Sequence, residues 1–147
     1  VYLGKLDNPE ILREVDIFKA SVSEIEAATG ESELPRAIRR IHSWGVEVVI
    51  VTRGSQSTIL SLSGKLYEIP AARSEVVADT TGAGDVFIGA FLAEYIRGED
   101  SIWSSCVGSA SASYVIEEIG PRGFKSRSEV YERATKIYEE ASLWKSI

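Results

Sequence analysis

The stretch Asp79-Thr80-Thr81-Gly82-Ala83-Gly84-Asp85 is the part of this 147-residue chain that decides the fold. It lies between a strand-rich region, Val46 to Ile69, and an apolar segment, Val86 to Arg97, that is typical of a helix. Two glycines around an alanine allow a tight turn that aims several backbone N–H groups at one point, where the helix macrodipole is also positive. The sequence therefore predicts an anion site at this turn.

Asp85 stands in the first turn of the predicted helix, beside that anion site. A carboxylate would repel a bound phosphate, so it is a poor choice for binding alone. It suits a general base that takes a proton from an attacking hydroxyl while the turn holds the developing charge. The structural alternative is that Thr81 or Asp85 caps a helix behind a glycine-rich turn. The whole run, followed by Phe87 and Gly89-Ala90, favours phosphate chemistry.

The run D-T-T-G-A-G-D-V-F-I-G-A, residues 79–90, resembles the second signature of the ribokinase-like (PfkB) family of small-molecule kinases. The resemblance extends from about Val15 to about Gly123, which is about half of the family's usual length. It implies an ATP-dependent phosphotransferase with a doubly wound α/β fold, in which helices cover a mainly parallel sheet. Residues 1–147 would then form a single domain, the C-terminal, nucleotide-binding half of such a kinase.

The same resemblance implies roles for the residues of the turn. Asp85 would be the catalytic base on the acceptor hydroxyl. The backbone of Gly82, Ala83 and Gly84 would form the anion hole for the transferred phosphoryl group. Asp79 would help to hold a monovalent cation such as K⁺.

Two other segments match nucleotide-binding parts of the family. Thr52 and Gly54 match its T-x-G element, which lines the nucleotide, whereas Arg53 replaces an apolar residue and either reaches a phosphate or lies in solvent. Ser109 and Ala112 belong to a run of small side chains that the family places against adenine. Without the resemblance, these patterns predict only a turn after a strand and a closely packed helix.

The segment Ser21-Val22-Ser23-Glu24 has two interpretations. As S-x-x-E at the start of a helix it is a capping box. By resemblance it aligns with the family's N-x-x-E motif, whose Glu positions Mg²⁺ and its waters near the phosphates, although Ser21 replaces the expected Asn. Both roles stay open for Glu24.

Composition excludes several classes of protein. The net charge of −6 argues against nucleic-acid binding by bulk electrostatics, and no run approaches the ~18 apolar residues of a membrane span. The single cysteine, Cys106, cannot form an internal disulfide and is expected to be a small buried hydrophobe. The only histidine, His42, is expected to be structural or exposed. We expect a cytoplasmic protein, and the absence of G-x-x-x-x-G-K-[ST] excludes a P-loop enzyme.

The acceptor and the state of assembly are less determined. Nothing matches the family's first signature or its β lid, so the small-molecule acceptor could be a sugar, a sugar phosphate or a nucleoside. The alternative function is a nucleotide-binding or interaction module without turnover. We expect a homo-oligomer or a missing N-terminal half, because Val15–Phe18 would form an open sheet edge. The helix face carrying Leu34, Ile38 and Ile41 would be exposed beside it.

Periodicity along the chain predicts alternating helices and strands. Helices are expected at residues 9–13, 21–29, 34–44, 83–97, 101–118 and 126–144. Strands are expected at residues 15–18, 46–52, 58–62 and 65–69, the last two as a hairpin across Ser63-Gly64.

Overall fold

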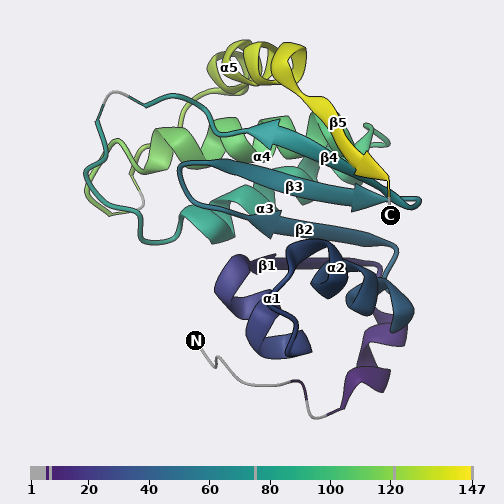
Figure 1. Ribbon diagram of the computed structural model, residues 1–147. Helices are drawn as coiled ribbons and strands as arrows, with labels where there is room; N and C mark the ends of the chain where they lie inside the picture. The colour runs from purple at the N-terminus through teal and green to yellow at the C-terminus, as the bar shows by residue number, and fades with distance from the viewer. Residues whose placement is uncertain (1–5, 7, 75, 121, 147) are drawn as a thin grey trace. The chain divides into compact units, whose positions relative to one another are not determined.

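The computed structural model describes residues 6, 8–74, 76–120 and 122–146, which form both helices and strands (Figure 1). The helices are a 3-10 helix η1 (Pro9–Glu14), α1 (Val22–Thr29), α2 (Leu34–Ser43), α3 (Ala83–Tyr95), α4 (Ser101–Val115) and α5 (Arg127–Glu140). The strands are β1 (Ile17–Ser21), β2 (Val48–Thr52), β3 (Ser57–Leu62), β4 (Lys65–Pro70) and β5 (Ser142–Ser146). The predicted α/β class is therefore confirmed.

The strands form one sheet in the order β1-β2-β3-β4-β5. β1 and β2 are parallel, with Ile17 opposite Val48 and Ser21 opposite Thr52. β3 and β4 form the predicted hairpin, whose turn has φ of 50° at Ser63 and 73° at Gly64, as a type I′ turn requires. Residues 53–56 alone join β2 to β3, too few for a parallel crossover. The sheet is therefore mixed, with its parallel pair at the β1 end.

The chain divides into two compact units. The first unit contains residues 1–54, 59–67 and 143–147, and the second contains residues 55–58 and 68–142.

In the first unit, the core lies between α1, α2 and the strands. Ile38 and Ile41 of α2 and Ile25 of α1 are fully buried together with apolar residues of the sheet. The prediction that the α2 face carrying Leu34, Ile38 and Ile41 is exposed is therefore wrong. The physical reason is that α1 and β2 pack against this face and remove it from water. β1 does lie at an edge of the described sheet, although it begins at Ile17 rather than at Val15.

His42 has a structural role in the first unit, as the sequence favoured. Its Nδ1 lies 2.8 Å from the Val46 carbonyl oxygen and its Nε2 lies 2.7 Å from Ser61 Oγ. Because a carbonyl can only accept, Nδ1 carries the proton of that bond. The imidazole thus joins the end of α2 to β3.

In the second unit, α3 and α4 pack at close range. A Cβ added to Gly108 of α4 would lie 2.9 Å from the carbonyl oxygen of Phe87 and 3.2 Å from its ring. Phe87 is 3% exposed and Cys106, two residues before Gly108 in α4, is fully buried. The small side chains of α4 therefore permit a close helix–helix contact, which is the structural reading of that segment.

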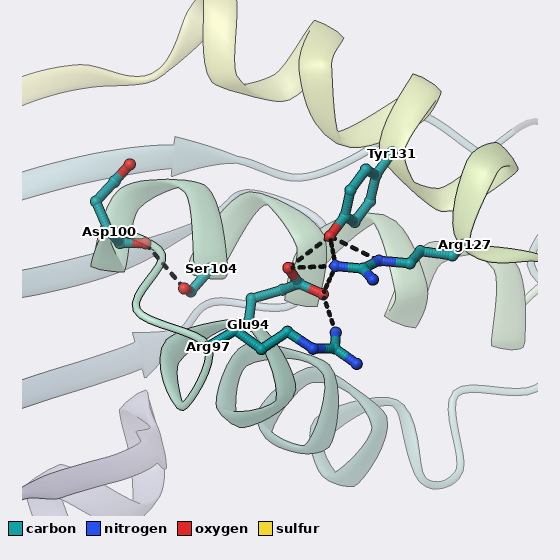
Figure 2. Close-up of polar contacts among 6 residues, drawn as sticks. All are labelled: Glu94, Arg97, Asp100, Ser104, Arg127 and Tyr131. Carbon is teal, nitrogen blue, oxygen red and sulfur yellow. Dashed lines mark hydrogen bonds and ion pairs between the residues drawn. The ribbon is translucent and has the colours of Figure 1, made fainter.

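A buried carboxylate ties α3 to α5 (Figure 2). Glu94 is only 3% exposed, and its oxygens accept from Arg97 Nη1 at 2.9 Å and from Tyr131 Oη at 2.5 Å. Arg127 Nη2 lies 3.3 Å from the same carboxylate. The charge of Glu94 is thus compensated by cations and a hydroxyl, as burial requires.

The last helix was predicted to extend to Trp144, and this prediction is wrong. α5 ends at Glu140, Ala141 is extended with ψ of 135°, and Ser142–Ser146 forms β5 beside β4. Pairing with a strand distant in sequence overrides the local helical pattern. In the first unit, Trp144 also lies under the guanidinium of Arg53, 5.7 Å from the ring centroid to Cζ.

No helix in the part of the chain that the structure describes combines the length and the apolar character that a bilayer crossing requires.

The contact between α3 and α4 can be tested by a glycine pair. Gly108→Ala should lower the free energy of unfolding by about 1–3 kcal/mol, because its methyl group must displace Phe87. Gly89→Ala is the matched control on exposed α3 surface, where an added Cβ meets nothing within 4 Å. It should be neutral or stabilising by up to about 1 kcal/mol. Urea denaturation measures both, and equal effects would contradict the close packing.

Candidate functional site

The glycine turn begins α3 with a left-handed residue. Gly82 is the N-terminal cap of α3 with φ of 80°, a conformation that glycine adopts without a Cβ clash. Its carbonyl accepts from the N–H groups of Asp85 and Val86, both at 3.0 Å. The N–H of Ala83 donates to the Thr80 carbonyl at 3.3 Å. The predicted turn at residues 82–84 is therefore formed as the opening of a helix.

The N-terminus of α3 lacks a side-chain cap. Ser21, Asp100 and Ser126 supply such caps to α1, α4 and α5 through hydrogen bonds to N–H groups. The structural alternative, in which Thr81 or Asp85 caps α3, is thus not what the structure contains. Because the first N–H groups of a helix have no intrahelical acceptor, this end can accept an anion.

Asp85 occupies the first turn of α3, and its side chain is exposed. It therefore stands next to the N–H groups of Gly82, Ala83 and Gly84 along the chain and lies open to an approaching molecule. A carboxylate in that place can accept a proton beside a site that favours negative charge. The structure thus holds these four residues together in one turn.

Asp79 clamps the start of the turn to the loop that follows α4. Its Oδ1 accepts from the Thr81 N–H at 2.9 Å, and its Oδ2 accepts from the Gly120 N–H at 3.2 Å. The N–H groups of Ala78 and Asp79 donate to the Ile116 carbonyl at 2.8 and 3.3 Å. The bond from Thr81, followed by that from Gly120, lowers the pKa of the Asp79 carboxyl below its ordinary value.

Ser109 holds α4 against the segment that leaves β4. Its hydroxyl donates to the Pro70 carbonyl at 3.2 Å and accepts from the Ala72 N–H at 3.3 Å, and the residue is 8% exposed. Ala112, one turn further, is partly exposed. A packing role for Ser109 is therefore present, while contacts of Ser109 and Ala112 with adenine stay a prediction.

Cys106 behaves as expected of a small buried hydrophobe. Burial raises the pKa of its thiol to about 12. A thiol with such a pKa carries almost no thiolate at neutral pH, so it is a poor nucleophile.

Three predicted site residues belong to the first unit. Thr52 Oγ1 lies 3.4 Å from the Ala20 carbonyl at the ends of β2 and β1, and Gly54 has φ of 62° in the turn after β2. The capping box of Glu24 is complete: Ser21 N–H donates to Glu24 Oε2 at 2.7 Å, and Glu24 N–H donates to Ser21 Oγ at 3.3 Å. The bond from the Ser21 N–H lowers the pKa of Glu24. Its structural role is confirmed, and its role toward Mg²⁺ stays a prediction.

Exposed apolar residues next to the glycine turn were not predicted from the sequence. Val76 and Val77 are 59% and 61% exposed, and Ile119 is 78% exposed beside the Gly120 partner of Asp79. The available signal was a pair of valines in a segment that forms neither helix nor strand. Such side chains offer apolar surface to a ligand near the turn.

The chain matches a known protein family over most of its length. Residues 4–127, which include every residue of the turn, match the family described as pfkB family carbohydrate kinase. This chain belongs to the pfkB family. The predicted family is thus confirmed on most of the chain.

Two curated members of the pfkB family illustrate the range of relatives. Cytidine kinase of Thermococcus kodakarensis is 38% identical over 60% of this chain and 32% of its own length. The 2-dehydro-3-deoxygluconokinase of Escherichia coli K12 is 33% identical over 76% of this chain and 37% of its own length. The chain therefore spans about a third of the length of these relatives.

Solved structures of pfkB-type kinases share the fold. Arabidopsis thaliana ribokinase, complexed with ribose and ATP, matches 86% of this chain and 43% of its own chain with a TM-score of 0.79 at 27% identity. A putative ribokinase II of E. coli, in complex with ATP and Mg²⁺, matches 87% of this chain and 42% of its own chain with a TM-score of 0.79 at 27% identity. The ribokinase-like fold predicted from the sequence is confirmed.

Titration of Asp79 tests the clamp at the turn. The Thr81 and Gly120 amide proton shifts should move together, with a midpoint below the ordinary pKa of 3.8. Because this pKa is lowered, the Asp79 carboxylate stabilises the folded chain fully above pH 3.8. This stabilisation is lost as the pH falls through the pKa that Asp79 has in the folded state. Nuclear magnetic resonance at decreasing pH measures the two amide proton shifts. Asp79→Asn should remove the shared titration, and separate midpoints for the two amides would contradict a common clamp.

Proposed function

We propose that this chain is the nucleotide-binding and catalytic half of an ATP-dependent kinase that phosphorylates a hydroxyl of a sugar or nucleoside. The observation that carries this proposal is the uncapped N-terminus of α3, with Gly82 in a left-handed conformation and Asp85 exposed in the first turn. The kinase names of the pfkB relatives support the reaction type.

Asp85 acts as general base in this proposal. Its carboxylate takes the proton of the acceptor hydroxyl as that oxygen bonds to the γ-phosphorus of ATP. The bond from the γ-phosphorus to the bridging oxygen breaks, and ADP leaves with that electron pair. The N–H groups of residues 82–84, with the positive end of α3, stabilise the negative charge on the transferred phosphoryl oxygens.

Glu24 is our candidate for positioning Mg²⁺. The described residues contain no group of three or more His, Cys, Asp or Glu side chains arranged to hold a metal ion. A single carboxylate nevertheless fits Mg²⁺, which proteins bind through one or two carboxylates, substrate phosphates and waters. When bound, the ion would supply charge neutralisation to the phosphates. The capping box holds Glu24 Oε2 in place for that role.

Asp79 is our candidate for a monovalent cation such as K⁺. Its two oxygens already orient Thr81 and Gly120, so a cation there would be held next to the anion hole through the same clamp. A potassium response of a complete kinase, lost in Asp79→Ala, would support the assignment, and a response that persists in that variant would remove it.

Thr52, Gly54, Ser109 and Ala112 are assigned to the nucleotide by resemblance to the family. Thr52 at the end of β2 and Gly54 in the turn after it would contact phosphates or ribose, and the two residues of α4 would face the adenine base. The proposed acceptor is a sugar or a nucleoside. We also propose that the chain associates with an N-terminal half or with a second copy, and that the protein is cytoplasmic.

Nucleotide binding is the first test. The chain should bind MgATP and MgADP, with the N–H groups of residues 82–84 donating hydrogen bonds to the phosphate oxygens. Calorimetric titration measures it, and amide shifts at Gly82 and Gly84 place it on the turn. The absence of both heat and amide shifts at millimolar nucleotide would contradict the proposal.

Turnover is the second test. In a complete kinase that carries this half, Asp85→Asn should lower kcat by about 10²–10⁴-fold, the usual contribution of a positioned general base. Nucleotide affinity should stay similar or rise, because a charge facing the phosphates is removed. Glu139→Gln is the matched control, an exposed carboxylate of α5 outside the turn, and should leave kcat unchanged. Unchanged turnover in Asp85→Asn would remove Asp85 from the mechanism.

A further inference from the structure

A pocket lies within the second unit, bounded by the segment after β4 and by helices α4 and α5. Its volume is about 390 Å³, within the range of small-molecule sites. Pro70, Ala72 and Ile137 supply apolar walls, and Tyr114 supplies an aromatic one. None of the residues 79–85 lines it, so it is separate from the glycine turn.

One cation of this pocket is held rigidly. Arg133 Nη1 donates to Ser113 Oγ at 2.7 Å and to Glu117 Oε1 at 2.8 Å. Its guanidinium also lies 3.4 Å from the ring centroid of Tyr114. The side chain is 23% exposed. Because Arg133 is already ordered, a ligand that binds it loses little additional side-chain entropy.

The opposite wall is fastened to the same framework. Ser109 holds the backbone of Pro70 and Ala72, and Ser74 Oγ donates to Glu117 Oε1 at 3.1 Å. Arg73 lies on this wall between the two fastened points and is exposed. The carboxylate of Glu117 thus joins the wall that carries Arg73 to the side chain of Arg133.

Cations outnumber carboxylates among the residues that line the pocket. The lining contains Arg73, Arg133 and Lys136 and two carboxylates, Glu132 and Glu140, in a chain whose net charge is −6. The carboxylate of Glu117, outside the lining, pairs with Arg133. Glu132 pairs with Lys136 at 3.5 Å, but both side chains are more than 70% exposed, so this pair is weak and easily rearranged. Glu140 is also exposed, where water and salt screen its repulsion of an anion.

We propose that this pocket binds a small molecule that carries a phosphate group on an apolar or aromatic body. Arg133 and Arg73 bind the phosphate from two walls, and Lys136 adds charge at the rim. Guanidinium groups suit phosphate because their planar N–H donors match two of its oxygens. The body of the ligand packs on Pro70, Ala72 and Ile137.

Phenyl phosphate is the probe, because it joins both features. Titrated into the ¹⁵N-labelled chain, it should shift the amide signals of Ala72, Tyr114 and Ile137. Inorganic phosphate should shift the same signals at higher concentration, since it lacks the apolar body, and phenol should not shift them. Shifts confined to Gly82–Gly84, or equal binding of phenol, would overturn the proposal.

A charge-removed variant completes the test. The double variant Arg73→Gln, Lys136→Gln should bind phenyl phosphate at least about tenfold more weakly, because hydrogen bonds to a charged group are lost. Both residues are exposed, so the variant should remain folded, which unchanged amide signals of the second unit away from the pocket would verify. Arg36→Gln, an exposed cation of α2 outside the pocket, is the matched control. Unchanged affinity in the double variant would overturn the assignment.

Discussion

The close approach of α3 and α4 at Gly108 is the constraint on which the second unit depends. It brings the carbonyl of Phe87 within a distance that no Cβ tolerates, so the two helices pack backbone to backbone. α3 begins at the glycine turn with Asp85, while α4 carries Ser109 and leads to Gly120, the partner of Asp79. This single contact between Gly108 and the backbone of Phe87 therefore sets the spacing between the two helices that carry these groups. Farther along α3, Glu94 adds the link to α5.

Local chemistry could be predicted from the sequence. The left-handed Gly82, the capping box of Ser21 and Glu24, and the hairpin turn at Ser63-Gly64 each depend on residues within four positions of one another. Short-range hydrogen bonds and φ preferences decide such features, so their residue types are informative without any knowledge of the rest of the fold. The family signature at residues 79–90 added the fold class, since it extends beyond what a glycine turn alone specifies.

Features that depend on distant residues were missed or wrong. β5 forms because Ser142–Ser146 pairs with β4, which no local pattern after α5 could indicate. Ile38 and Ile41 are buried because α1 and β2 cover them, whereas the sequence reading assumed that a missing half would have done so. The clamp of Asp79 on Gly120 spans 41 residues. The resemblance pointed to Asp79 as a cation ligand, but it did not show that the carboxylate already holds two backbone N–H groups.

The buried thiol of Cys106 is a natural probe of local opening at α4. The chain has one cysteine, and its thiol is fully buried in α4 and has a pKa of about 12. A thiol reagent can therefore modify the folded chain only through transient openings that expose α4. The rate of that modification measures how often the α3–α4 packing separates, and a ligand that fastens either helix slows it. A single labelling experiment, with no engineered probe, thus reports the local opening equilibrium of the second unit.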